Sequence, residues 1–264
     1  MSIHSRIKLL SDWLTGKMNG INLIELIQNL LAPPLHVRAL ARIKKITETN
    51  KYYVIYFKNL RAPLYFPRHI NISNLYQVIG ELYNPFNAHY YESENTRVVK
   101  NDIVLDCGAA EGLFSLLKAN KCKKIYAIEP LPDFIKSLKK TFKGFRNVKI
   151  IPFALSDKER RGFLSESGIS SFLTKKKGIP VKVTSIDNLF YKNIPVSYIK
   201  ADLEGSELEM LKGAVKTIKK NRPKIAIAIY HKKEHGRQIE KLLKKMNKQY
   251  RIEIRGLILH AWVE

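Results

Sequence analysis

Beyond residue 100 the sequence alternates between short apolar runs and amphipathic stretches, and no other feature constrains the fold as strongly. Strands are expected at residues 103–106, 124–129, 148–151, 196–202, 224–230, 251–254 and 257–262. Helical spacing occupies residues 113–119, 132–142, 206–220 and 234–246, and a polar stretch over residues 156–179 is expected to form a hairpin and loop. Strands that alternate with helices form a parallel sheet with helices on both faces. The sequence therefore predicts an α/β, Rossmann-like, doubly wound and mostly parallel seven-stranded sheet with an antiparallel edge strand.

The first 99 residues mix helical and strand patterns and carry no chemical motif. A hairpin is expected over residues 51–66 and a helix over residues 73–83. We therefore predict a small N-terminal α+β cap, helical and hairpin in character, over residues 1–99. The sheet domain is predicted to occupy residues 100–264.

Apolar residues between Ile7 and Leu31 have the spacing of two amphipathic helices, and Pro33-Pro34 ends the second. Such an apolar stripe usually packs against the rest of the protein. Docking on a membrane surface is the alternative, but the polar faces of these helices are not rich in lysine, as those of an interfacial helix are. We therefore expect the stripe to pack against the sheet domain.

The chain is strongly basic, with 47 Lys and Arg against 23 Asp and Glu and a net charge of +24. Residues 1–99 hold 12 basic and 6 acidic residues, and residues 100–264 hold 35 and 17, so most of the excess lies in the second part. A field of this sign attracts nucleic acid, an anionic membrane surface or a polyanionic substrate. A coding bias toward lysine is an equally good explanation, since charge alone does not identify a partner.

Two cysteines among 264 residues cannot form a disulfide framework or a four-cysteine zinc site. The sequence has no apolar run long enough to span a membrane, and charged residues interrupt the N-terminal region where a signal peptide would be apolar. These features predict a cytoplasmic protein. They leave its oligomeric state open.

The segment Asp106-Cys-Gly-Ala-Ala-Glu-Gly112 lies where the first strand of the sheet domain turns into a helix. In a doubly wound sheet, ligands bind outside the carboxyl ends of the strands, at such turns. Gly108 would permit a tight turn and Gly112 close packing of the helix. A dinucleotide would place its pyrophosphate here, but Asp106 and Glu111 oppose an anion.

Carboxylates at this turn suit a cationic ligand, and S-adenosylmethionine (SAM) carries both an ammonium and a sulfonium group. Glu129 ends the second strand, where an acidic side chain can accept hydrogen bonds from ribose hydroxyls. Capping of the following helix is the alternative role for Glu129. The pattern therefore favours SAM as the ligand.

Several blocks of the chain, in order and spacing, resemble the FkbM family of SAM-dependent methyltransferases. The blocks are residues 106–112 (DCGAAEG), 128–130 (IEP), 154–157 (ALSD), 199–207 (IKADLEGSE), 213–214 (GA) and 230–232 (YHK). The resemblance is strongest at residues 199–207, because the family shows an IKxDxEGxE block there, and it covers about residues 75–232. It implies a class I methyltransferase fold and, usually, methylation of a hydroxyl on a sugar, polyketide or other small molecule.

Carried over to this chain, the resemblance implies that the turn after the first strand holds the methionine part of SAM, that Glu129 contacts the ribose, and that residues 153–155 border the adenine. The expected cofactor-binding residues are Asp106, Gly108, Ala109, Glu111, Gly112, Glu129, Pro130, Phe153, Ala154 and Leu155. The chain departs from the family at Ala110 and Glu111, where a small polar and an apolar residue are more frequent.

Methyl transfer to a hydroxyl needs a positioned group that takes the proton. Asp202 and Glu204 alternate at the end of the fourth strand, so their side chains should point to opposite faces unless the turn redirects them. His231 follows the fifth strand on the same side of the sheet, where an imidazole could act as a base. We therefore take Asp202, Glu204 and His231 as the candidate catalytic residues. The spacing does not demand a metal, and no metal ligands are assigned.

Together these features predict a SAM-dependent methyltransferase that methylates a hydroxyl on a sugar, glycolipid or other small molecule. The basic surface keeps one alternative open, an RNA methyltransferase whose binding would weaken as salt rises. A methyltransferase-like binding domain without catalysis is the other alternative. The expected partners are a small-molecule or glycan acceptor and, through the basic exterior, an anionic membrane surface or nucleic acid.

Overall fold

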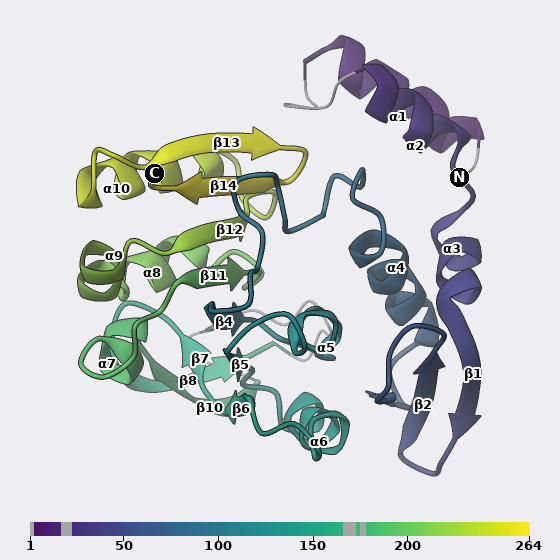
Figure 1. Ribbon diagram of the computed structural model, residues 1–264, viewed down its shortest axis with the longest axis horizontal. Coiled ribbons are helices and arrows are strands. Elements are labelled where there is room, and N and C mark those ends of the chain that lie inside the picture. Colours follow the sequence, from purple (N-terminus) through teal and green to yellow (C-terminus); the bar gives the residue numbers. More distant parts are fainter. Residues whose placement is uncertain (1–2, 17–22, 166–172, 175–177) are drawn as a thin grey trace.

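The computed structural model describes residues 3–16, 23–165, 173–174 and 178–264, and a seven-stranded sheet forms its centre (Figure 1). Its strands are β4 (Ile103–Cys107), β5 (Lys124–Ile128), β6 (Val148–Ile151), β11 (Tyr198–Ala201), β12 (Lys224–Ala228), β13 (Arg251–Arg255) and β14 (Ile258–Trp262). They lie in the order β13-β14-β12-β11-β4-β5-β6, and β14 is the strand that runs antiparallel to its neighbours. The predicted mostly parallel sheet is confirmed.

Helices cover both faces of this sheet, as a doubly wound fold requires (Figure 1). On one face lie α5 (Leu113–Lys118) and α6 (Pro132–Thr141), and on the other α7 (Ile186–Phe190), α8 (Glu207–Lys212), α9 (Val215–Asn221) and α10 (His235–Met246). The single helix predicted over residues 206–220 is wrong, because the chain breaks between α8 and α9. The carboxylate of Asp187 accepts hydrogen bonds from the backbone N–H groups of Lys216 and Thr217 and so starts a second helix there.

The N-terminal part contains the predicted hairpin and helix, and two elements that the sequence pattern did not predict. The hairpin is β2 (Tyr52–Phe57) with β3 (Leu64–Pro67), and the helix is α4 (Ile72–Leu82). The additional elements are α3 (Leu35–Arg42) and the edge strand β1 (Ile43–Glu48), which pairs with β2. β1 escaped prediction because lysines and other polar residues fill most of its positions.

The N-terminal elements share a hydrophobic core with helices of the main sheet. Ile55, Phe66 and Leu75 are fully buried in one cluster with Leu113 of α5 and Phe134 of α6. The rings of Phe66 and Phe134 lie 6.3 Å apart between centroids. This shared core fixes α4 beside the sheet, and so positions the segment that follows α4.

Helices α1 (Ile3–Leu14) and α2 (Leu23–Leu31) lie at one end of the molecule (Figure 1). The expectation that their apolar stripe packs against the sheet domain is wrong for most of it. Leu26 is buried, and Glu25 forms an ion pair with Arg255 of β13, but Ile24 and Leu31 are 68% and 75% exposed. Contact with the body through one face of α2 therefore leaves the other face uncovered.

A small second sheet follows β6, in the region where a hairpin and loop are predicted. It contains β7 (Ala154–Leu155), β8 (Arg160–Leu164), β9 (Leu173–Thr174) and β10 (Ile179–Thr184) in the order β7-β10-β8-β9. β8 and β10 pair antiparallel, as a hairpin does. The rest of the predicted loop, residues 166–172 and 175–177, lies outside the described residues.

Candidate active site

The segments that follow β4, β5, β6 and β11 meet at one edge of the main sheet and line a cleft. Parallel strands place their carboxyl ends at the same edge, which explains the convergence. The predicted cofactor-binding residues that line the cleft are Gly108, Ala109, Glu111, Glu129, Pro130, Phe153, Ala154 and Leu155. Asp106 and Gly112 do not line it.

The turn at Gly108 is dictated by a close approach between two strands. Gly108 has φ +74°, and a Cβ atom at this position would lie 1.9 Å from the backbone oxygen of Asp202. The backbone N–H of Asp202 in turn donates to the oxygen of Cys107 at 3.0 Å. The glycine is therefore needed for the approach of the β11 segment as well as for the tight turn predicted from the sequence.

Asp106 organises the turn from beneath the cleft. Its fully buried carboxylate accepts a hydrogen bond from Ser115 Oγ at 2.7 Å and lies 3.1 Å from Lys200 Nζ. Lys200 Nζ also donates to the backbone oxygen of Gly108 at 2.7 Å. Burial alone would lower the pKa of Lys200, but the charges of Asp106 and Asp202 raise it, so the ammonium persists and joins the two strands.

Two buried acidic side chains face the cleft. Burial raises the pKa of Glu111 and of Glu129 to about 7, because each carboxylate loses most of its contact with water. Glu129 accepts hydrogen bonds from the backbone N–H groups of Ala110 and of Leu131, the residue before α6, and so joins the turn after β4 to the segment that leads into α6. A cationic ligand in the cleft would stabilise both carboxylates in their charged form.

Asp202 is held by residues from the segment after α4. Tyr91 Oη donates a hydrogen bond to Asp202 Oδ2 at 2.6 Å, and His89 Nε2 lies 2.9 Å from the same hydroxyl and 3.4 Å from Oδ2. His89 Nδ1 contacts Glu81 Oε2 of α4 at 3.3 Å. Asp202 Oδ1 is buried and accepts no hydrogen bond from the residues that the structure describes.

Glu81, His89 and Tyr91 all line the cleft, and none of the three is predicted from the sequence. They lie more than 100 residues before Asp202 in the chain, in a part without a chemical motif. The one available signal was the density of ionisable and aromatic residues around Tyr90. The shared core that fixes α4 and the hydrogen bond from Tyr198 Oη to the backbone oxygen of Tyr91 bring them to the sheet.

The turn after β11 brings Glu204 to the same side as Asp202. Glu204 has φ +50°, a left-handed conformation that reverses the alternation expected for a strand. As a result, His231 Nε2 lies 3.4 Å from Asp202 Oδ1 and 3.3 Å from Glu204 Oε2. The three predicted catalytic residues are thus neighbours, although His231 stands behind the cleft and does not line it.

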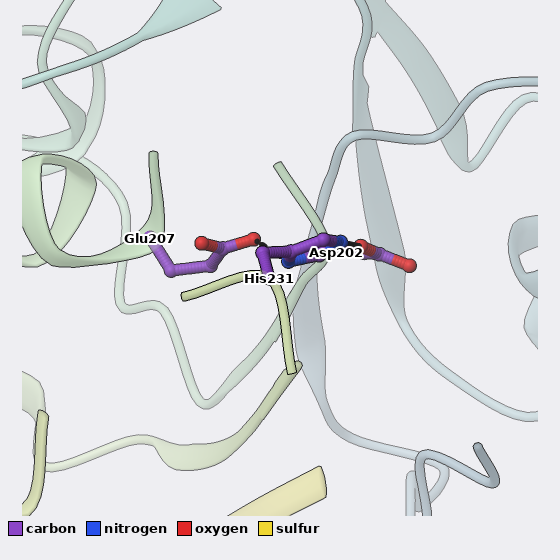
Figure 2. Close-up of side chains that lie close together, drawn as sticks. All are labelled: Asp202, Glu207 and His231. Atoms are coloured by element: carbon purple, nitrogen blue, oxygen red, sulfur yellow. Dashed lines mark ion pairs between the residues drawn. The ribbon is translucent and has the colours of Figure 1, made fainter. Parts of the chain in front are cut away.

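Glu207 orients His231 from the opposite side. Figure 2 shows the imidazole between the carboxylates of Glu207 and Asp202, with His231 Nδ1 3.0 Å from Glu207 Oε1. The same Glu207 oxygen accepts hydrogen bonds from the backbone N–H groups of Leu203 and Gly205. The side chains of Asp202, Glu207 and His231 are close enough to be considered as metal ligands. However, the ring separates the two carboxylates, so this arrangement fits a protonated imidazole better than one shared cation.

His89 and His231 both have raised pKa values. Burial alone would lower the pKa of His89, but its hydrogen bonds to Asp202 and Glu81 raise it to about 9. Burial likewise opposes the charge on His231, but Glu204 and Glu207 raise its pKa to about 10. Conversely, Asp202 has a lowered pKa despite its burial, because His89 and Lys200 stabilise the carboxylate.

A raised histidine pKa makes stability depend on pH. With a pKa of about 9 in the folded protein and about 6.5 in the unfolded chain, His89 contributes its full stabilisation below pH 6.5 and loses it as the pH rises through 9. Thermal melting over this range should show a falling melting temperature, and a shallower fall in His89→Gln. The exposed His69→Gln serves as control and should keep the wild-type slope. Equal slopes in all three proteins would contradict the role of His89.

Comparison with known proteins places these features in a family. The family model described as the methyltransferase FkbM domain matches residues 106–251, more than half of the chain. No curated protein matches. The solved structure of a methyltransferase FkbM from Methylobacillus flagellatus aligns with a TM-score of 0.50 at 20% identity, over 71% of this chain and 54% of that chain.

Other solved structures align less closely. An rRNA methylase from Streptococcus thermophilus has a TM-score of 0.41 at 12% identity, over 63% of this chain and 90% of that chain. Aeropyrum pernix fibrillarin, with natively bound SAM, has a TM-score of 0.43 at 12% identity, over 84% of this chain and 99% of that chain. The chain spans about half the length of the FkbM structure that it matches. The family match, together with the predicted motifs that it covers, shows that the chain belongs to the FkbM family of SAM-dependent methyltransferases.

Proposed function

We propose that this chain binds SAM in the cleft and transfers its methyl group to a hydroxyl of a sugar, glycolipid or other small molecule. The observation that carries this proposal is the carboxylate of Asp202, which several side chains fix in place: Tyr91 and His89 contact Oδ2, while Oδ1, 3.4 Å from His231 Nε2, accepts no hydrogen bond from the described residues. A hydroxyl acceptor is the group that such an oxygen would receive. SAM, when bound, supplies an electrophilic methyl group on its sulfonium.

The chemistry of the cleft residues fits SAM. Glu111 and Glu129 provide negative charge for its ammonium and hydrogen-bond acceptors for its ribose, while Phe153, Ala154 and Leu155 form an apolar wall suited to the adenine. Burial raises the pKa of both glutamates to about 7. A cationic ligand should therefore bind most tightly above this pH, where both carboxylates are ionised. The site favours a cation over a pyrophosphate.

Asp202 is proposed to take the proton of the acceptor hydroxyl. Transfer of a methyl group to the hydroxyl oxygen makes its proton strongly acidic, so a carboxylate with a lowered pKa is still basic enough to receive it. Tyr91 and His89 hold Oδ2, and Oδ1, which lies 3.4 Å from His231 Nε2 without a hydrogen bond among the described residues, is the oxygen proposed to accept the hydrogen bond from the acceptor. Most of the remaining rate enhancement would come from alignment of acceptor and methyl group.

His231 is proposed to position Asp202 and Glu204. Its pKa of about 10 keeps the imidazole protonated at neutral pH, which suits a cation between carboxylates better than a base. Glu207 holds the ring in this orientation. Glu204 lines the cleft and is proposed to contact the acceptor.

A screen with tritiated-methyl SAM would test the proposed acceptor class. Sugars, glycolipids, small hydroxylated metabolites and RNA would each be incubated with the protein, and labelled product would be counted. Label on a hydroxylated small molecule is expected. Label on RNA alone, with activity that falls steeply as salt rises, would replace the proposal by the RNA alternative. Absence of transfer together with SAM binding would favour a binding domain.

Glu111→Gln should weaken SAM binding by about tenfold or more, because the variant loses a buried negative charge opposite a cation. In the wild type, affinity should rise with pH through about 7, as Glu111 and Glu129 ionise. Calorimetry in buffers of different ionisation enthalpy would measure both the affinity and the released protons. Glu159→Gln removes an exposed charge and is the matched control. A pH-independent affinity in the wild type would contradict this assignment.

A further inference from the structure

The N-terminal helices carry an unusual share of the exposed apolar side chains. Nine of the 14 large exposed hydrophobic residues of the described chain lie between residues 7 and 40. We call these nine the N-terminal apolar surface; they are Ile7, Leu10, Leu14, Leu23, Ile24, Ile27, Leu31, Val37 and Leu40. A soluble monomer rarely exposes a large continuous apolar patch without a partner for it.

Unpaired basic side chains lie beside this surface. Residues 6–45 contain seven Lys and Arg against two Asp and Glu, and one of these acids, Glu25, is engaged with Arg255. The exposed cations are Arg6, Lys8, Arg42, Lys44 and Lys45. None of them forms an ion pair within residues 6–16, 23–165, 173–174 and 178–264. Arg6 and Lys8 lie on α1, Arg42 on α3, and Lys44 and Lys45 on β1.

A groove adjoins the surface, between α2, α3 and α4. It is lined by the small and apolar residues Ala32, Pro33, Val37, Ala41 and Phe86, and by Arg38 and Arg42. Burial lowers the pKa of Arg38, whose Nε donates to the backbone oxygen of Pro33 at 2.8 Å. An apolar groove with two guanidinium groups suits a ligand that combines hydrocarbon with an anionic head.

Helix α4 separates this groove from the active-site cleft. Gly80 and Tyr83 line the groove, while Glu81 and Leu82 line the cleft. Whatever occupies the groove therefore lies one helix away from the acceptor side of the site. No helix in the described part of the chain is long and apolar enough to cross a membrane.

We propose that the N-terminal apolar surface docks on an anionic lipid surface, with its helices lying in the interface. Apolar side chains would enter the boundary between headgroups and acyl chains, and the flanking cations would contact anionic headgroups. A second copy of the chain is the less suitable occupant, because two proteins of charge +24 would bring the same cations face to face. The lipid surface complements both the apolar residues and the charge.

Co-sedimentation of the full chain with vesicles would test this proposal. The protein should bind vesicles of phosphatidylcholine mixed with phosphatidylglycerol, bind pure phosphatidylcholine weakly, and be released by salt. Ile24→Asp with Leu31→Asp should abolish binding, because charged groups cannot enter the acyl boundary. Lys44→Glu with Lys45→Glu should weaken it by about tenfold or more, since two attractive charges become repulsive.

Two matched variants separate this surface from general effects of charge and apolarity. Lys244→Glu with Lys245→Glu makes the same charge change on α10, and Val99→Asp changes an exposed apolar residue outside the surface; both should bind vesicles like the wild type. Equal loss of binding in Lys44→Glu/Lys45→Glu and its α10 counterpart would overturn the proposal. So would absence of binding to anionic vesicles, or a dimer in light scattering that Ile24→Asp/Leu31→Asp dissociates. SAM binding by all variants is the check that they fold, and it is independent of the lipid result.

Discussion

Asp202→Asn is expected to lower the rate of methyl transfer by about 100- to 10,000-fold, the range typical of a lost proton acceptor. The amide has nearly the volume of the carboxylate, and its oxygen can still accept the hydrogen bond from Tyr91. That orientation puts the NH2 group where Oδ1 stands in the wild type, 3.4 Å from His231 Nε2. The variant therefore cannot take the acceptor proton, and it also loses the ion pair with His231.

Affinity for SAM should change little in Asp202→Asn, because the residues proposed to hold SAM follow β4, β5 and β6. Single-turnover rates with an acceptor found by the screen, and calorimetry with SAM, would measure the two quantities separately. Asp157→Asn changes a half-exposed carboxylate outside the cleft and should retain wild-type turnover. Unchanged turnover in Asp202→Asn, or a loss explained entirely by weaker SAM binding, would remove Asp202 from the proposed role.

The sequence predicted the sheet and its ligand edge because both depend on local patterns. Strands β4, β5, β11 and β12 are short, apolar and flanked by turns, so each could be recognised alone. The rule that parallel strands end at one edge then brought their terminal residues together without further information. This is why Glu129 and Asp202, 73 residues apart in the chain, could be placed in one site.

The contacts that fix Asp202 could not be predicted in the same way. His89 and Tyr91 belong to a segment without regular structure, and its position depends on distant contacts: Tyr91 packs in one cluster with Phe114 and Tyr198, and Tyr198 Oη donates to the backbone oxygen of Tyr91. Such packing is a long-range property that no spacing rule encodes. The direction of Glu204 likewise depends on a left-handed backbone, which strand alternation excludes.

For α1 and α2, the sequence predicted the helices but not what their apolar stripe contacts. Its helical period was recognised correctly, but a period says which residues share a face and not what covers that face. One favourable ion pair, between Glu25 and Arg255, helps to select the face that contacts the body. The remaining apolar residues stay exposed, and the vesicle experiment tests whether a lipid surface covers them.

Gly108→Ala should lower the free energy of unfolding by about 3 kcal/mol or more, which corresponds to a fall of roughly 6 to 12 °C in melting temperature. The new methyl group would stand 1.9 Å from the backbone oxygen of Asp202, and the φ of +74° is itself unfavourable for alanine. This clash could be relieved only if the β11 segment moved, but the backbone hydrogen bond from Asp202 N–H to the oxygen of Cys107 holds the segment in place. SAM affinity should fall as well, because the turn and Asp202 move together.

Alanine substitutions at two further glycines should cost less stability, so that the three variants can be ranked. At Gly112 the added Cβ would meet Leu138 Cδ2 at 2.4 Å, the end of a flexible side chain, with φ +89°; at Gly144 it would meet nothing within 4 Å. Thermal unfolding should therefore rank the alanine variants Gly144, Gly112, Gly108 from mildest to most severe. The clash at Gly112 can be relieved by rotation of the Leu138 side chain, but the clash at Gly108 can be relieved only if the backbone of the β11 segment moves. Equal destabilisation of the two variants would therefore show that the turn tolerates this movement. The close approach of the two strand ends would then be a consequence of the fold and no longer the reason for the glycine.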